Sequence, residues 1–156
     1  MSNIYSLGMQ APSVICRGKT AQSISNNSTF VQLTNWTETQ DTTNSFNAVA
    51  GIFTAPIAGN YQYSIAHNLL VTGAQIAASF DHLSLKKNGV DQFADSRLNF
   101  FSVAMLTSQD SLAQMSGIIN LAIGDTMAFT RRQSHAAAYN DTTSASQNYI
   151  NISYIK

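Results

Sequence analysis

The sequence predicts an all-β sandwich, because apolar side chains alternate with small or polar ones in several segments and turn residues separate these segments. From Tyr61 to Leu69 the large side chains occupy the odd positions, and Ile150, Ile152 and Tyr154 repeat the pattern near the end of the chain. This period of two is typical of a half-buried strand. Turn signals recur about every 8–12 residues without a long helical pattern, which favours a sandwich or a barrel.

Turn dipeptides mark the ends of two further predicted strands. Leu83 and Leu85 lie on one face of a strand that ends at Asn88-Gly89, where this residue pair supplies the positive φ of a tight turn. Another strand stops at Gly124-Asp125 and a new one begins at once over 126–129, which predicts a hairpin. The polar, turn-rich segment 26–47 is predicted to be a long loop region around one short strand.

The segment from Leu98 to Leu106 departs from the alternation, because it places bulky apolar side chains on both faces. A strand that is apolar on both faces must be covered on both. The core can cover one face and a neighbouring subunit the other, although the chain's own long loops are an alternative cover. We expect a subunit interface here, formed by Phe100, Phe101, Val103 and Met105.

The composition is unusually poor in charge. Charged residues make up 10% of the 156 residues, against roughly 25% in an average soluble domain, and the net charge is zero. A chain with so little repulsion between copies is prone to associate, so we expect an oligomer rather than a soluble monomer. The chain lacks the basic field that nucleic acid or an anionic membrane requires. Lys86-Lys87 and Arg131-Arg132 are interpreted as solvated strand ends.

The beginning of the chain is interpreted as an arm, residues 1–12, before a domain over residues 13–156. The first residues lack the charged start and apolar stretch of a signal peptide. Cys16 is the single cysteine and cannot form a disulfide within the chain. Its apolar neighbours predict a small buried residue rather than a nucleophile.

Three ordered segments resemble the complement globular-head and tumour necrosis factor superfamily. Residues 51–63, Gly-Ile-Phe-Thr-Ala-Pro-Ile-Ala-Gly-Asn-Tyr-Gln-Tyr, look like its signature strand-turn-strand. Residues 83–89 are similar to its hydrophobic strand ending in Lys-Asn-Gly. Residues 116–125 resemble its segment with Ser-Gly, Leu and Gly-Asp, and 149–156 occupy the place of its last strand.

This resemblance covers residues 13–156 and implies a ten-stranded jelly-roll sandwich that forms compact trimers around a threefold axis. The chain differs from the secreted animal members, because it lacks a signal peptide, a collagen-like stalk and paired cysteines. Its variant Phe-Thr-Ala-Pro-x-Ala-Gly looks more like the copies carried by bacteriophage virion proteins.

The sequence gives no support for an enzyme, a cofactor or a metal site. We interpret His67 as a hydrogen-bonded core or interface histidine, because it shares a face with Tyr63 and Ile65. An Asp81-His82 step directs the two side chains to opposite strand faces, and no Gly-x-Ser-x-Gly elbow occurs. A zinc site of one histidine per subunit on a threefold axis, and a calcium site at Asp91 with Asp95 or Asp110 with Asp125, remain open alternatives.

The leading hypothesis is a bacteriophage virion protein: a trimeric cement or decoration protein on the capsid surface, with the major capsid protein or another virion protein as its partner. The arm would dock there through four apolar side chains, Ile4, Tyr5, Leu7 and Met9. The second hypothesis is a receptor- or glycan-binding tip module of a tail or head fibre. Its contacts to a bacterial surface glycan would be Trp36, Tyr139 and Asn140, although Trp36 can equally cover the sandwich edge. A cellular or secreted bacterial protein is a third alternative.

Overall fold

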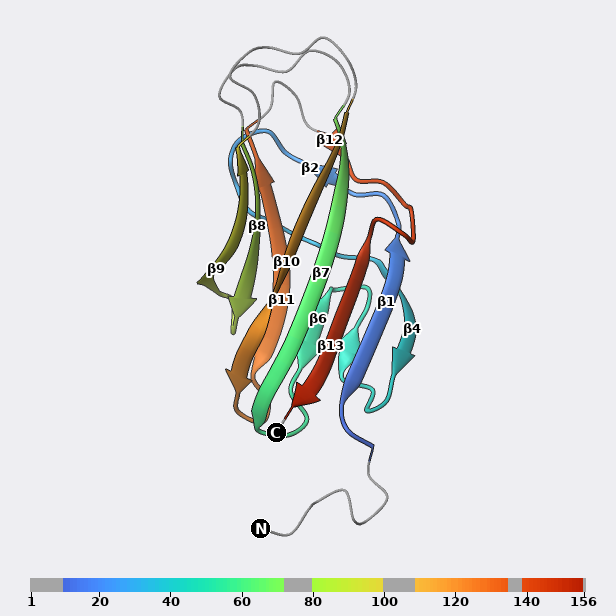
Figure 1. The fold of residues 1–156 in the computed structure, drawn as a ribbon, viewed down its shortest axis with the longest axis vertical. Coiled ribbons are helices and arrows are strands. Elements are labelled where there is room, and N and C mark those ends of the chain that lie inside the picture. Colours follow the sequence, from blue (N-terminus) through green and yellow to red (C-terminus); the bar gives the residue numbers. More distant parts are fainter. Residues whose placement is uncertain (1–9, 72–79, 100–108, 135–138, 156) are drawn as a thin grey trace.

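The computed structural model describes residues 10–71, 80–99, 109–134 and 139–155, which form two packed β-sheets (Figure 1). The strands are β1 (Ser13–Lys19), β2 (Ser23–Ile24), β3 (Val31–Gln32), β4 (Trp36–Asp41), β5 (Phe46–Asn47), β6 (Ile52–Thr54), β7 (Gly59–Val71), β8 (Phe80–Lys87), β9 (Val90–Asn99), β10 (Gln109–Leu121), β11 (Thr126–Gln133), β12 (Tyr139–Asn140) and β13 (Tyr149–Ile155). The described part contains no helix long and apolar enough to span a membrane.

Sheet 1 has the strand order β10-β7-β13-β1-β4, and sheet 2 has the order β5-β6-β11-β8-β9, with β3 paired to β11. Ten strands lie on these two paths, while β2 and β12 form a small ladder of their own. The named pairings are all antiparallel. The prediction of an all-β jelly-roll sandwich is confirmed.

The long strand β7 organises sheet 1. It pairs with β10 on one side, from Gly59–Leu121 to Val71–Gln109, and with β13 on the other. Its odd-numbered side chains point into the sandwich, and Tyr61, Tyr63 and Ile65 are at most 2% exposed. The predicted alternation of burial is confirmed from Tyr61 to Ile65, whereas farther along β7 the even-numbered residues Ala66 and Asn68 are buried as well.

The core divides into an aromatic end and a polar end. At the end where β7 begins, the Tyr61 ring lies 5.2 Å from that of Phe53 and 5.5 Å from that of Tyr154, measured between centroids. Tyr63 packs at 5.8 Å from Phe129. Such tilted and edge-on contacts suit the ring quadrupoles. At the other end, around His67, the core contains charged side chains. Cys16 is fully buried, as predicted.

Left-handed backbone accounts for the residues found at two of the turns. Asn88 and Gly89 have φ of 52° and 77°, so the tight turn predicted between β8 and β9 is confirmed. Gly51 has φ of 69°, and a Cβ there would lie 1.9 Å from the carbonyl oxygen of Leu33. Both the conformation and the space at position 51 therefore select glycine.

Two sequence predictions about connections are wrong. The turn at Gly124-Asp125 does not close a hairpin, because β10 pairs with β7 in sheet 1 whereas β11 pairs with β3, β6 and β8 in sheet 2. This turn carries the chain from one sheet to the other. The segment 26–47 is not a loop alone, since it contains β4, an edge strand paired to β1. Four successive exposed polar side chains gave β4 the appearance of a loop.

Candidate functional site

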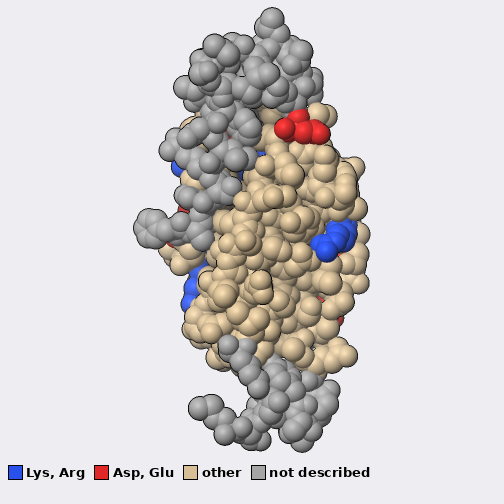
Figure 2. Space-filling model, viewed as in Figure 1, with Lys and Arg blue, Asp and Glu red and all other residues tan. Residues whose placement is uncertain are grey.

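The outer face of sheet 1 is broad and almost uncharged. Its outward side chains on β7, β10 and β13 are amides, hydroxyls and a few apolar groups: Gln62, Ser64, Leu70, Leu112, Gln114, Ser116, Ile118, Tyr149, Asn151 and Ser153. On β1 and β10 the outward charged groups are Arg17 and Asp110. Figure 2 shows how few charged side chains this view of the molecule presents. Covering such a surface costs less desolvation free energy than covering a charged one, provided that its amides and hydroxyls find hydrogen-bond partners in the covering surface.

The edge of this face is the long strand β10. It has 13 residues, and among the described strands β7 is its ladder partner. Two of its carbonyl oxygens, those of Ser111 and Asn120, accept from the side chains of Arg131 and Lys87. Ile118 is 64% exposed and Leu112 is 41% exposed. Natural edge strands are normally kept from pairing by lysines, prolines or a cover. β10 contains neither lysine nor proline, and its single charged residue, Asp110, lies at its beginning.

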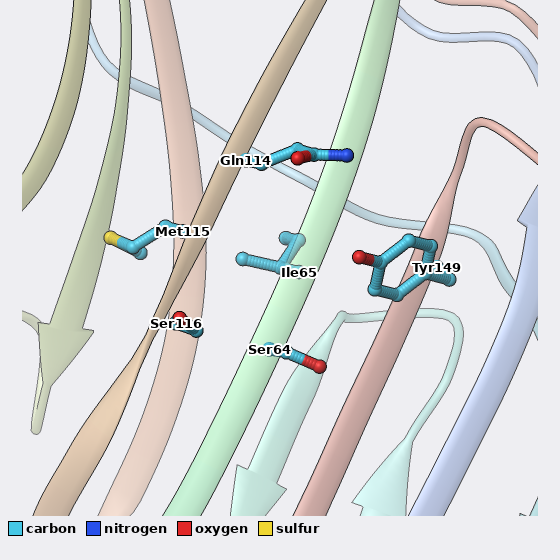
Figure 3. A pocket seen from close by; sticks show the side chains of 6 residues that line it. All are labelled: Ser64, Ile65, Gln114, Met115, Ser116 and Tyr149. Atoms are coloured by element: carbon cyan, nitrogen blue, oxygen red, sulfur yellow. The ribbon is translucent and has the colours of Figure 1, made fainter.

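An open hollow of about 260 Å³ lies on the outer face of sheet 1. Ser64 and Ser116 are register partners, and their small side chains leave space between Gln114 and Tyr149. Figure 3 shows the Gln114 and Tyr149 side chains reaching over β7 from its two sides. The guanidinium of Arg17 lies 5.2 Å from the centroid of the Tyr149 ring and packs against the ring. The hollow offers amide, hydroxyl and aromatic groups, which suit a neutral polar partner.

A second group of polar residues lies inside the sandwich and was not predicted. Arg131 of β11 is fully buried and donates from Nε to Asp81 Oδ1 at 2.7 Å and from Nη2 to Asp81 Oδ2. Nη2 also donates to the carbonyl oxygen of Ser111 at 2.8 Å. Ser111 Oγ donates to Asp81 Oδ2 at 2.6 Å. A two-point guanidinium-carboxylate pair thus crosses from β11 to β8 and ties in β10.

His67 connects this pair to a second one. Arg131 Nη1 lies 2.6 Å from His67 Nδ1, and because a guanidinium only donates, Nδ1 is the acceptor. The proton is therefore on Nε2, which donates to Asp141 Oδ2 at 3.1 Å. Burial lowers the pKa of His67 to about 4, so its imidazole is neutral at physiological pH. The interpretation of His67 as a hydrogen-bonded core histidine is confirmed.

Lys19 and Asp141 form the other end of the chain of contacts. Lys19 Nζ bonds to Asp141 Oδ2 and donates to Gln22 Oε1 at 3.2 Å. The backbone N–H of Gln22 donates to Asp141 Oδ1. Both charged side chains are 0% exposed. We name the connected side chains the buried polar chain: Lys19, Asp141, His67, Arg131, Asp81 and Ser111. Two cations and two carboxylates balance their charges within it.

The predicted site residues fall in three groups. Two groups and one histidine lie outside the described residues. They are the docking residues (Ile4, Tyr5, Leu7 and Met9), the interface residues (Phe100, Phe101, Val103 and Met105) and His135. The two aromatic residues named as glycan contacts are buried: Trp36 is 5% exposed, with its ring 6.3 Å from that of His67, and Tyr139 is 4% exposed in the core cluster. For Trp36 this burial agrees with the alternative that it covers the sandwich edge. Asn140 is exposed.

The solvated-end interpretation of Arg131-Arg132 is wrong for Arg131. The sequence contains a signal for these buried charges. Arg131 is two and four residues from the buried Phe129 and Met127, and Asp81 is two and four residues from the buried Leu83 and Leu85, so each charged side chain points to the same strand face as its apolar neighbours. Asp81 and His82 lie on opposite faces of β8 as expected, but both are buried. Within the described ranges, no three histidine, cysteine or acidic residues are grouped so that they could hold a metal ion.

The fold is shared with known solved structures. No family model and no curated protein matches the sequence. The Eiger TNF of S. frugiperda matches with a TM-score of 0.66 at 11% identity over 94% of both chains. The globular domain of zebrafish complement 1qA matches with 0.59 at 15% identity, over 93% of this chain and 98% of that one. Murine APRIL matches with 0.59 at 14% identity, over 94% and 100%. The chain therefore has the jelly-roll fold of TNF and complement globular-head domains.

Proposed function

We propose that this chain is a non-enzymatic structural and binding module that assembles as a homotrimer through the outer face of sheet 1 and its β10 edge. The observation that carries the proposal is the edge strand β10, which is long, exposes the apolar side chains of Leu112 and Ile118, and contains neither lysine nor proline. The resemblance of the sequence to the TNF and complement superfamily favours three subunits.

The chemistry of the core also supports a non-enzymatic role. The His67–Asp141 contact has the residue types of a catalytic dyad, but both side chains are fully buried. Their polar atoms are used within the buried polar chain, where Arg131 occupies His67 Nδ1. A general base needs access to the proton that it abstracts. The contact therefore serves the fold rather than a soluble substrate.

The proposed assembly is tested by light scattering on the purified chain and on Ile118→Lys. We expect a mass three times the 16.9 kDa of one chain. An ammonium group at position 118 would be buried without a counter-ion, which should raise the concentration at which the trimer dissociates by about 100-fold.

Ile123→Lys is the matched control for this prediction. Ile123 is 71% exposed but lies in the turn after β10, away from the outer face of sheet 1, so its trimer should be unchanged. A monomeric wild-type chain at high concentration would contradict the proposed assembly. A wild-type trimer that Ile118→Lys leaves intact would show that the interface lies elsewhere.

We further propose that the trimer is a bacteriophage virion protein and stabilises the capsid surface, with arm residues 1–12 docked on the major capsid protein. The phage-like variant at 53–59 and the nearly uncharged surface support this role. Trimers that bridge capsid subunits would add buried area across the joints.

A recognition tip is the second candidate, and the hollow beside Tyr149 favours it, because aromatic and amide groups suit sugars. The copy number per particle separates the two roles: hundreds of copies on the head indicate cement, whereas a few at a fibre tip indicate recognition.

A further inference from the structure

Lys19 and Asp141 are held together under conditions that are unusual for a lysine-carboxylate pair. Lys19 ends β1, whereas Asp141 follows β12 and forms a bridge to Leu69 of β7. The two residues are 122 positions apart in the sequence, and both side chains are 0% exposed. The contact between Nζ and Oδ2 is therefore fixed by the fold and closed to solvent.

We propose that Lys19 and Asp141 condense in the folded protein to an intramolecular amide, with a bond between Lys19 Nζ and Asp141 Cγ and the release of one water. The proposal concerns the subunit itself and does not depend on the proposed trimer. The product would join the first strand of sheet 1 covalently to the segment that precedes its strand β13.

Burial shifts the protonation equilibrium of Lys19 towards the amine, although the ion pair with Asp141 is its resting form. Burial lowers the pKa of Lys19, and Asp141 only partly offsets this effect. The centroid of the Trp36 ring lies 5.8 Å from Nζ, so the ring takes the place of water on that side, although its face also attracts the ammonium ion. The free amine is the form that attacks a carbonyl carbon. Few bulk water molecules can reach the pair to solvate the charges or reverse the reaction.

The carboxyl group is polarised at both oxygens. Burial raises the pKa of Asp141, but the hydrogen bonds from His67 and Lys19 outweigh this effect and lower it, so an ion pair is the resting state. A proton must pass from Nζ to the carboxylate before the attack. The backbone N–H of Gln22 holds Oδ1, and the Nε2–H of His67 holds Oδ2 at 3.1 Å. Oδ1 is therefore placed to become the amide oxygen and Oδ2 to leave.

The step balances without any other reactant. After the proton transfer, Nζ carries two hydrogens and Oδ2 one. Nζ bonds to Cγ, the Cγ–Oδ2 bond breaks, and Oδ2 leaves as water with one hydrogen from Nζ. His67 stays neutral in this step, and its Nε2–H donates a hydrogen bond that stabilises Oδ2 as it leaves. Its Nδ1 stays occupied by Arg131 throughout.

The same chain contains a matched pair that should not react. Lys87 Nζ lies 2.9 Å from Asp125 Oδ2, with the two side chains 30% and 18% exposed. Hydrogen bonds from Asn88 and Lys87 lower the pKa of Asp125 to about 2, so its carboxyl group stays ionised. Water also solvates the Lys87 ammonium. The pair has the residue types and proximity of Lys19–Asp141 without its burial.

Mass spectrometry of the purified, folded full chain tests the proposal. We expect an intact mass lower than the sequence mass by one water. Cleavage with trypsin should leave Lys19 uncut and give a branched peptide that joins residues 18–86 to residues 133–156, while Lys87 is cut normally. A folded wild-type chain with the full sequence mass and a normal cut at Lys19 would overturn the proposal.

Three variants identify the atoms involved. Lys19→Met should have its full sequence mass, whereas loss of water in this variant would point to dehydration of an aspartate and overturn the lysine assignment. Asp141→Asn should give the same cross-link with loss of ammonia. His67→Phe, followed in time after cell-free synthesis, should form the bond about 100-fold more slowly, because Oδ2 then leaves without a hydrogen-bond donor. An unchanged rate would overturn the role assigned to His67.

Discussion

Replacement of Arg131 by methionine is expected to lower the free energy of unfolding by about 3–5 kcal/mol, as is typical when one partner of a buried ion pair is removed. Arg131 is fully buried, and its guanidinium contacts Asp81, His67 and Ser111. The variant leaves the Asp81 carboxylate in the core without its guanidinium counter-ion. Urea denaturation followed by tryptophan fluorescence measures the loss, because Trp36 is the only tryptophan.

Arg17→Met is the control for this prediction. Arg17 is exposed, stacks on Tyr149 and donates from Nη1 to Asn151 Oδ1 at 3.0 Å, so its loss should cost less than about 1 kcal/mol. The double variant Arg131→Met with Asp81→Leu should be more stable than the sum of the single effects predicts, since it removes both charges. A loss below about 1 kcal/mol for Arg131→Met would show that the guanidinium is not coupled to the fold.

Acid is expected to destabilise the protein between pH 6.5 and 4 through His67. In the unfolded chain this imidazole binds a proton below a pKa near 6.5, whereas burial lowers its pKa in the fold to about 4. The unfolded state therefore binds more protons in this window, and stability falls as the pH falls. The gap between the two pKa values corresponds to about 3 kcal/mol.

Denaturation curves between pH 7 and 4 measure this effect in the wild type and in His67→Gln. The glutamine keeps a donor and an acceptor but does not titrate, so the slope of stability with pH should flatten in the variant. The result does not depend on a bond at Asp141, because burial and Arg131 disfavour the imidazolium in either case. Equal slopes in the two proteins, or an NMR spectrum of a protonated His67 at pH 6, would contradict the prediction.

Local patterns in the sequence were sufficient for the strands and some of the turns. The alternation in β7 and β13 predicts which side chains enter the core, because one face of each strand is buried. Asn88-Gly89 predicts its turn because few residue pairs adopt positive φ twice. The hairpin predicted at Gly124-Asp125 is wrong, because a connection between two sheets and a hairpin within one sheet can use similar turn residues.

The contacts within the buried polar chain could not be predicted from local sequence patterns. Its members come from β1, β7, β8, β10, β11 and the segment after β12, and the sequence does not state which of them meet. A charged residue in phase with an apolar run, such as Arg131 after Phe129, indicates a buried charge but not its partner. The predicted interface at 100–105 and the docking residues of the arm stay predictions.

The division of the core into an aromatic end and a polar end has a consequence for how the domain responds to its surroundings. Ring packing around Tyr61 depends on the hydration of apolar surface and so on temperature, whereas the ionic contacts around His67 depend on protons. Cooling and acidification therefore weaken opposite ends of one sandwich. Local opening of the domain would therefore begin at its aromatic end in the cold and at its polar end in acid.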